Sequence, residues 1–248
     1  GADGVESLSP RWAGVKKSFR PREVLSCAQE LIEHENLPND RIEFHLGSRH
    51  APGGYAWVFA KGGGRANVGL GIDATMTGGR TAVEFLDDFI EHRCPGGTRH
   101  RLVVGGCEVA KGLEKLITDG YVAVGEAAHQ NNPFSGGGIV NALEAADMAA
   151  DAITDALRSG TASRKALEPY ERAWKGSVGK NNDRFHRIAT VFYRLSDDEM
   201  NHITGRIIRT PGIVERSGVD PKRMLRAFIR VKPGLLWRFA RSILNSSS

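Results

Sequence analysis

One acidic side chain and a run of glycines lie close together in the second half of the chain. The apolar run from Tyr121 to Val124 predicts a buried strand that stops at Gly125. Glu126 follows, then Pro133, then the triplet at 136–138 and an alanine-rich segment with strong helix propensity. Glycines at the start of a helix let backbone N–H groups approach a ligand, and the helix dipole adds partial positive charge there. The pattern predicts a loop that holds an anion or an electron-rich ring carbonyl, although glycines also form purely structural turns.

A second group of residues that could bind a ligand is aromatic. Tyr55, Trp57 and Phe59 alternate along a predicted strand, so their side chains share one face of a sheet. A glycine-rich turn at 62–64 and a second alternating run at 66–72 complete a predicted β-hairpin. Three aromatic side chains on one face indicate either core and cross-strand packing or a wall for a long apolar ligand. The residues alone leave both interpretations open.

The remaining elements must position these two groups. The alternation of Arg41 to Gly47 predicts a strand, whereas the segment from Glu23 to His34 fits a strand or a short amphipathic helix. Helical spacing predicts an amphipathic helix over Thr81 to Arg93, and Arg101 to Ala110 reads as a further strand. The long segment after residue 160 reads as helical.

Composition bounds the class of protein. The chain has 248 residues, of which 40% are hydrophobic and 25% charged, as in a globular protein of one large or two modest domains. Three cysteines without a C-x-x-C pair predict neither a disulfide framework nor a zinc site, and we expect no metal. No apolar run is long enough to span a bilayer, and we expect a cytoplasmic location.

The C-terminal end is basic and apolar together. From Arg206 onward the sequence has ten Lys or Arg residues against Glu215 and Asp220, with Trp237 among several apolar residues. One interpretation is a solvated positive face on a packed helix. The other is peripheral contact with anionic lipid headgroups on the inner face of the cell membrane, which Trp237 suits. No nucleic-acid-binding motif accompanies the charge, so we expect no nucleic-acid partner.

The full pattern around the glycines is G-E-A-A-H-x-x-x-P-x-x-G-G-G-I-x-x-A. It resembles the second flavin-binding motif of the FAD-dependent flavoprotein monooxygenase superfamily, which includes the geranylgeranyl reductases. The resemblance implies FAD as cofactor, with Glu126 in the acidic role that holds the ribityl chain, in place of the usual Asp. The N-terminal G-A-D-G-x-x-S segment also resembles a motif of this family. The cofactor-binding residues implied are Ala2, Asp3, Gly125, Glu126, Pro133, Gly136, Gly137, Gly138 and Ile139.

The aromatic strand makes the resemblance more specific. The sequence Y-A-W-V-F-A-K followed by N-V-G-L-G is similar to the geranylgeranyl reductase family, the digeranylgeranylglycerophospholipid reductases in particular, with Ala60 in place of the family's proline. In that family the aromatic strand lines the prenyl-chain cavity. The resemblance therefore implies that Tyr55, Trp57 and Phe59 bind the substrate.

The resemblance also implies a fold. We expect an α/β chain of mixed α+β character, with part of a three-layer FAD-binding domain, an antiparallel-sheet substrate domain and C-terminal helices. The expected boundaries are 1–20 for the end of the FAD-binding domain, 21–112 for the substrate domain, 113–160 for the second FAD motif and its helix, and 161–248 for the helical region. Because no G-x-G-x-x-G turn occurs, we expect this chain to be the C-terminal portion of a longer protein.

The implied activity is FAD-dependent reduction of isoprenoid double bonds, on archaeal-type ether lipids or other geranylgeranyl compounds. The substrate partner is then an isoprenoid lipid, and the external electron donor, NAD(P)H, ferredoxin or another, stays open. For the proton the sequence offers only Tyr55 and His129, and a structural role for either is the competing interpretation. The alternatives are a flavin monooxygenase of the same superfamily and a non-catalytic isoprenoid-binding fragment.

Overall fold

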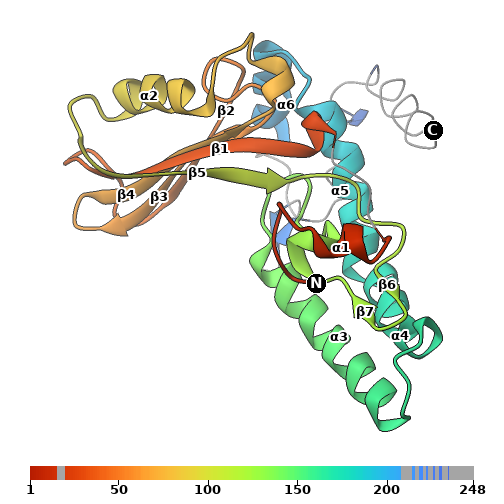
Figure 1. Ribbon diagram of the computed structural model, residues 1–248. Coiled ribbons are helices and arrows are strands. Elements are labelled where there is room, and N and C mark those ends of the chain that lie inside the picture. Colours follow the sequence, from red (N-terminus) through yellow and green to blue (C-terminus); the bar gives the residue numbers. More distant parts are fainter. Residues whose placement is uncertain are drawn as a thin grey trace. The chain divides into compact units, whose positions relative to one another are not determined.

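The structure, a computed structural model, describes residues 1–15 and 20–207, together with positions 214–215, 218–219, 222, 226, 229–230 and 234. The described chain forms two compact units (Figure 1). One contains residues 1–15, 20–23 and 108–191, and the other contains 24–107 and 192–207. The basic C-terminal segment predicted from the sequence lies almost entirely outside the described residues. Helices and an antiparallel sheet confirm the predicted α/β class.

The unit at 24–107 is built on a five-stranded sheet with the strand order β2-β3-β4-β1-β5. The ladders of β1 with β4, β2 with β3 and β3 with β4 are antiparallel. The bounds are β1 Val24–Glu33, β2 Ile42–Leu46, β3 Tyr55–Gly62, β4 Arg65–Ile72 and β5 Thr98–Glu108. The structure thus decides the ambiguous segment after Glu23 in favour of a strand and confirms the hairpin. The last strand begins three residues before the predicted Arg101.

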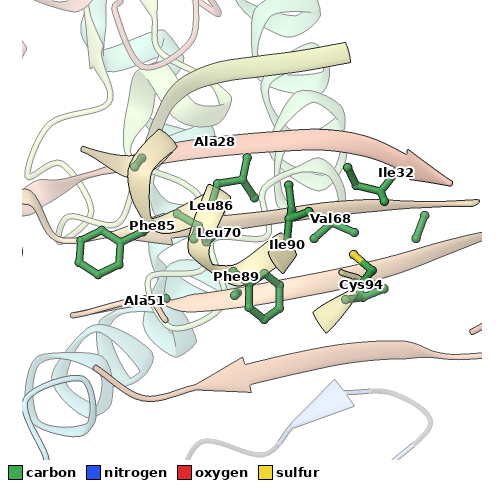
Figure 2. Close-up of a cluster of buried hydrophobic side chains, with 14 of the residues drawn as sticks. Ala28, Ile32, Ala51, Val68, Leu70, Phe85, Leu86, Phe89, Ile90 and Cys94 are labelled. Atoms are coloured by element: carbon green, nitrogen blue, oxygen red, sulfur yellow. The ribbon is translucent and has the colours of Figure 1, made fainter. Parts of the chain in front are cut away.

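Helix α2 (Ala82–Arg93) covers one face of this sheet. Thr81 and Glu84 form a capping box that fixes its first residue, since each side chain accepts from the other's backbone N–H. In Figure 2, Leu86, Phe89 and Ile90 point toward the small and branched side chains of the sheet. The strand residues of this core are Ala28, Ile32, Ala56, Val58, Ala66, Val68, Leu70 and Ile72, all at most 1% exposed. Their period of two leaves the alternate residues for the opposite face.

The same unit also contains the 3-10 turn η2 (Ala74–Met76) and helix α6 (Asp197–Ile207). The turn that follows β2 contacts the start of this helix. The backbone N–H of Ser48 donates to Asp197 Oδ1 at 2.8 Å, and its hydroxyl donates to Oδ2. A residue from far along the sequence therefore anchors the β2–β3 connection.

The other unit is mainly helical. Its elements are α1 Ser9–Trp12, η1 Pro21–Glu23, β6 Ile117–Thr118, β7 Tyr121–Val122, η3 Gly125–Ala128, α3 Ile139–Arg158, α4 Arg164–Gly176 and α5 Val178–Phe192, and a two-stranded ladder joins β8 Val214–Glu215 to β9 Gly218–Val219. Helix α3 buries only alanines against α4, at positions 145, 149, 152 and 156. Opposite them α4 presents Leu167, Tyr170 and Trp174. Small against large is a combination that lets two helices approach closely.

A half-buried ion pair links β2 to α2. The guanidinium of Arg93 donates to both carboxylate oxygens of Glu43, at 2.8 and 2.9 Å, and His45 lies 3.1 Å from the same carboxylate. The Arg93 hydrogen bonds lower the pKa of Glu43 from 4.5 to about 2. Because the folded pKa is the lower one, the stabilisation is complete above pH 4.5 and is lost as the pH falls toward 2.

We therefore predict that Glu43→Gln lowers the free energy of unfolding by about 1 kcal/mol at pH 7, a value below that of a buried pair because solvent screens the carboxylate. The difference from wild type should shrink as the pH falls below 4.5. Urea unfolding of both proteins between pH 7 and pH 3 measures it, with the exposed Glu91→Gln of the same helix as the control. A difference that stays constant over this range would contradict the assignment.

Candidate functional site

The turn at Gly125 is closed by two hydrogen bonds between Gly125 and Gln130, one to the side chain and one between backbone groups. Gly125 has a positive φ of 69°, and its N–H donates to Oε1 of Gln130 at 2.6 Å. The backbone N–H of Gln130 donates back to the Gly125 carbonyl at 3.2 Å. Between them His129 has φ 55° and ψ 49°, the one positive φ of a non-glycine residue in the part of the chain that the structure describes. Such a conformation is strained, and it is held here by the residues around it.

Gln130 also connects this turn to helix α4. Its Nε2 donates to the hydroxyl of Tyr170 at 2.8 Å, and that hydroxyl donates to the carbonyl of Ala123 at 2.7 Å. Both side chains are at most 1% exposed. Burial raises the pKa of Tyr170, so the hydroxyl keeps its proton and remains a donor. The amide and the phenol thus fix the strand end before the turn and the turn itself as one piece.

The glycines that follow form a compact loop. Oδ1 of Asn132 accepts from the N–H groups of Phe134 and Ser135, and the Asn132 backbone bonds to residues 136 and 137 in both directions. Pro133 within the loop is buried. A Cβ at Gly138 would lie 2.0 Å from Oδ1 of Asn131, so a side chain at 138 would displace the loop. Close approach, and not a special φ, is the reason for glycine at this position.

Two asparagine side chains from helices donate hydrogen bonds to carbonyls of the loop. Asn141 of α3 donates to the carbonyl of Gln130 at 2.8 Å. Asn182 of α5 donates to the carbonyls of both Gln130 and Asn131, at 3.1 and 3.0 Å. Asn182 is 5% exposed, so these bonds replace water at buried acceptors. The sequence alone does not reveal the role of Asn182, because nothing local distinguishes it from its exposed neighbour Asn181.

The loop leads into helix α3, whose N-terminus has no side-chain cap. Helix α3 begins at Ile139 with Gly138 as its N-cap, as predicted, without a side-chain cap and without an acidic residue in its first turn. Ile139 is 81% exposed and Val140 is 65% exposed. The backbone N–H groups of this first turn lack intrahelical partners, and the dipole of a 20-residue helix adds positive charge. The site suits an anion or a ring carbonyl flanked by apolar surface.

Glu126 lies partly buried beside this loop. Its Oε1 accepts from the backbone N–H of Glu108 at 2.9 Å and from Nδ2 of Asn131 at 3.0 Å. Within the described residues its Oε2 accepts no hydrogen bond. One oxygen therefore braces the loop, while the other is available for a ligand hydroxyl. The assignment of Glu126 to the ribityl chain stays a prediction.

The N-terminal G-A-D-G turn lies beside the Gly125 turn. The nitrogen of Gly1 donates to the carbonyl of Val122 at 2.7 Å, and Val124 N–H donates to the carbonyl of Gly1 at 2.9 Å. This is the hydrogen-bond pattern of parallel neighbours, so both turns leave the same edge. The predicted strand to Val124 pairs with β6 through Tyr121 and Val122, and the Ala123 N–H donates to the carbonyl of Leu116 on the same side. Val124 donates to Gly1 on the opposite side of the strand.

Asp3 has local partners that the sequence pattern does not reveal. Its carboxylate accepts from the hydroxyls of Ser7 and Ser9 and from the backbone N–H groups of Leu8 and Ser9. The Ser7 and Ser9 hydrogen bonds hold the pKa of Asp3 well below its usual range. The carboxylate thus secures the start of α1. A cofactor contact at Ala2 and Asp3 remains a prediction, and such a contact would use their backbone groups.

In the other unit the three aromatic side chains lie on the sheet face opposite α2, half-buried. Their neighbours Ala56 and Val58 belong to the core under α2, whereas the three rings pack on the opposite face with side chains of adjacent strands. A role of this face in substrate binding stays a prediction. Phe44 of β2 completes the group, with its ring centroid 5.3 Å from Tyr55 and 5.8 Å from Phe59. Phe44 lies within the strand predicted from Arg41 to Gly47, and the sequence did not assign it to the site. Burial raises the pKa of Tyr55 to about 12.

The two proton-donor candidates lie in separate units. His129 is 7% exposed, and its Nδ1 lies 3.2 Å from the carbonyl of Lys111. This contact and its backbone conformation favour the loop-bracing interpretation of His129. Tyr55 lies within the aromatic face. Among the described residues, no helix has the length and apolarity to cross a bilayer, and no group of three or more His, Cys, Asp or Glu side chains is arranged to hold a metal ion.

Comparison with solved structures places the fold. CmlS, a flavin-dependent halogenase, superposes with a TM-score of 0.59 at 16% identity, over 96% of this chain and 50% of that chain. A geranylgeranyl bacteriochlorophyll reductase-like protein from Thermoplasma acidophilum superposes with a TM-score of 0.86 at 30% identity, over 97% of this chain and 60% of that chain. The fold is one that flavin-dependent enzymes share.

Sequence comparison then gives the family. Residues 23–109 match the model of the geranylgeranyl reductase catalytic domain. The digeranylgeranylglycerophospholipid reductase of Methanothrix thermoacetophila is 38% identical over 244 residues, which cover 98% of this chain and 61% of that relative. The chain is thus similar to geranylgeranyl reductases over nearly its whole length, which confirms the resemblance read from the motifs. It spans about three fifths of the length of these relatives.

The asparagine contacts generate a stability prediction. Asn182→Ala should lower the free energy of unfolding by about 1–3 kcal/mol, because two buried carbonyls each lose a hydrogen bond and only that of Gln130 keeps the one from Asn141. Chemical denaturation measures this, and hydrogen exchange of residues 130–138 should become faster. Asn181→Ala is the matched control, since that side chain is exposed and, among the described residues, bonds only to Arg184. Equal stability of the two variants would show that Asn182 does not hold the loop.

Proposed function

We propose that this protein is an FAD-dependent oxidoreductase that reduces the carbon–carbon double bonds of geranylgeranyl groups on membrane ether lipids or related isoprenoid compounds. What supports the proposal first is the family: its relatives are named digeranylgeranylglycerophospholipid reductases. These names do not favour the monooxygenase or the non-catalytic module. What supports the site is the uncapped start of α3 behind a loop held in place by buried amides.

The residues of the loop fit a flavin. The first-turn N–H groups of α3 would face a pyrophosphate or a ring carbonyl, and Gly138 leaves room for its approach. Glu126 would accept from ribityl hydroxyls through Oε2, while Gly125, Pro133, Gly136 and Gly137 shape the loop. When bound and reduced, a flavin supplies the hydride for one alkene carbon. The second carbon takes a proton, so each reduced bond gains two hydrogen atoms.

The protein's own contribution is position and exclusion of water. Tyr55, Trp57, Phe59 and Phe44 present an apolar surface that suits an isoprenoid chain, which has no charge to bind. Alignment of the alkene is therefore the main task of these side chains. At neutral pH Tyr55 retains its proton, because its pKa of about 12 lies far above. We propose Tyr55, ahead of His129, as the group that holds the transferable proton.

We also propose that the basic segment from Arg206 brings the enzyme to its lipid. Ten Lys or Arg residues against two acidic ones would attract an anionic headgroup layer. Contact would be peripheral and on the inner face of the membrane. This part of the proposal rests on charge in the sequence alone.

The deciding experiment uses purified full-length protein loaded with FAD and reduced with dithionite under anaerobic conditions. With a digeranylgeranyl phospholipid added, we expect flavin reoxidation and a product that has gained two hydrogen atoms per reduced bond, measured by mass spectrometry. A hydroxylated product formed only with oxygen would establish the monooxygenase instead. Lipid binding by a protein that takes up no flavin would establish the binding module.

Glu126 allows a direct test of the cofactor site. We predict that Glu126→Ala weakens FAD binding about tenfold, because the ribityl hydroxyls lose a charged acceptor. Glu126→Gln keeps an oxygen for the Glu108 N–H and for Asn131, so it separates bracing from charge. Flavin-to-protein absorbance after gel filtration and fluorescence titration give the two measurements. If Glu126→Ala retains FAD as wild type does, Glu126 has no part in binding the cofactor.

A further inference from the structure

The indole of Trp57 spans a whole strand of the sheet. Trp57 on β3 is in register with Gly69 on β4, and Gly69 is in register with Gln29 on β1. The indole Nε1–H donates to Oε1 of Gln29 at 3.0 Å, so the ring reaches from β3 to β1 across the position of Gly69. Three residues on three adjacent strands therefore define where the ring lies.

Gly69 is required by the ring and not by the backbone. A Cβ at this position would lie 2.6 Å from Cε2 and Cζ2 of Trp57 and 2.8 Å from its Nε1. Gly69 does not have a positive φ, so alanine would fit the strand conformation itself. The absence of a side chain at 69 is what allows the indole to lie flat over β4.

Gln29 selects one orientation of that ring. An indole N–H can only donate, and in a partly buried position the loss of its acceptor is costly. The ring of Phe59 lies 5.7 Å from the indole and only 17° from parallel, so the fixed indole continues the aromatic surface. Without the amide of Gln29, the side chain of Trp57 could turn away from this plane.

We propose that Gln29 is a positioning residue for substrate alignment: through its hydrogen bond it fixes the indole of Trp57 over Gly69 as the surface against which an isoprenoid chain lies. The inference rests on the proposed reductase function and extends it to residues outside the aromatic strand. Gln29 itself acts through Trp57. The position of the ring then decides which double bond is presented for reduction.

The first test is Gln29→Leu in the full-length, FAD-loaded enzyme. We expect kcat/KM for a digeranylgeranyl phospholipid to fall about tenfold, toward the value of Trp57→Ala, with unchanged flavin content. We expect partially reduced products to accumulate in a different pattern. Gln29→Glu keeps the acceptor oxygen and should retain the wild-type pattern. Glu33→Gln, at the exposed end of the same strand, is the control.

The second test uses Gly69→Ala, which displaces the ring by contact. Because both substitutions act through one side chain, the double variant with Gln29→Leu should be no slower than the slower single variant. The NMR resonance of the Trp57 indole N–H should shift in both single variants. Wild-type turnover and product pattern in Gln29→Leu, or additive losses in the double variant, would overturn the inference. A wild-type enzyme that reduces no prenyl lipid would instead refute the proposed function.

Discussion

Buried backbone carbonyls must be given donors, and this requirement explains how the glycine loop holds its shape. The segment from Gly125 to Gly138 has few large side chains to pack, so burial of apolar area cannot fix it. Amide side chains do so: those of Asn141 and Asn182 donate to the carbonyls of Gln130 and Asn131. Each of these hydrogen bonds supplies a donor to a buried carbonyl, which would destabilise the fold if it were left without one. The open start of α3 is located by this network.

In the sheet, the alternation of side chains along each strand sets which residues form the core and which form the aromatic face. Its period of two separates a face of small and branched residues under α2 from a face of aromatic rings. Both faces use the same three central strands, so the core that stabilises the unit also sets the register of the aromatic side chains. A shift of one residue in β3 would exchange Trp57 for Val58 and remove both the core and the surface.

The sequence predicted the local features well. Alternation, glycine turns and helical spacing were enough for the hairpin, for α2 and for the start of α3 at Ile139. It also predicted that Glu126 and the glycines share one loop. It could not reveal the partners that come from distant positions, because a hydrogen bond between Trp57 and Gln29 or between Asn182 and Gln130 leaves no local periodicity. The local role of the Asp3 carboxylate was missed for a different reason: its partners are the hydroxyl and N–H groups of residues just after it, and no sequence pattern marks them.

Evolutionary drift along α3 should be uneven around the helix. The four alanines at 145, 149, 152 and 156 share a buried cluster with Tyr170, whose hydroxyl reaches Gln130 and Ala123. A bulkier residue on that stripe would force α4 outward and withdraw the phenol from both partners. Purifying selection would therefore preserve methyl-sized positions that touch no ligand at all, and the exposed side of the same helix would be free to vary far more.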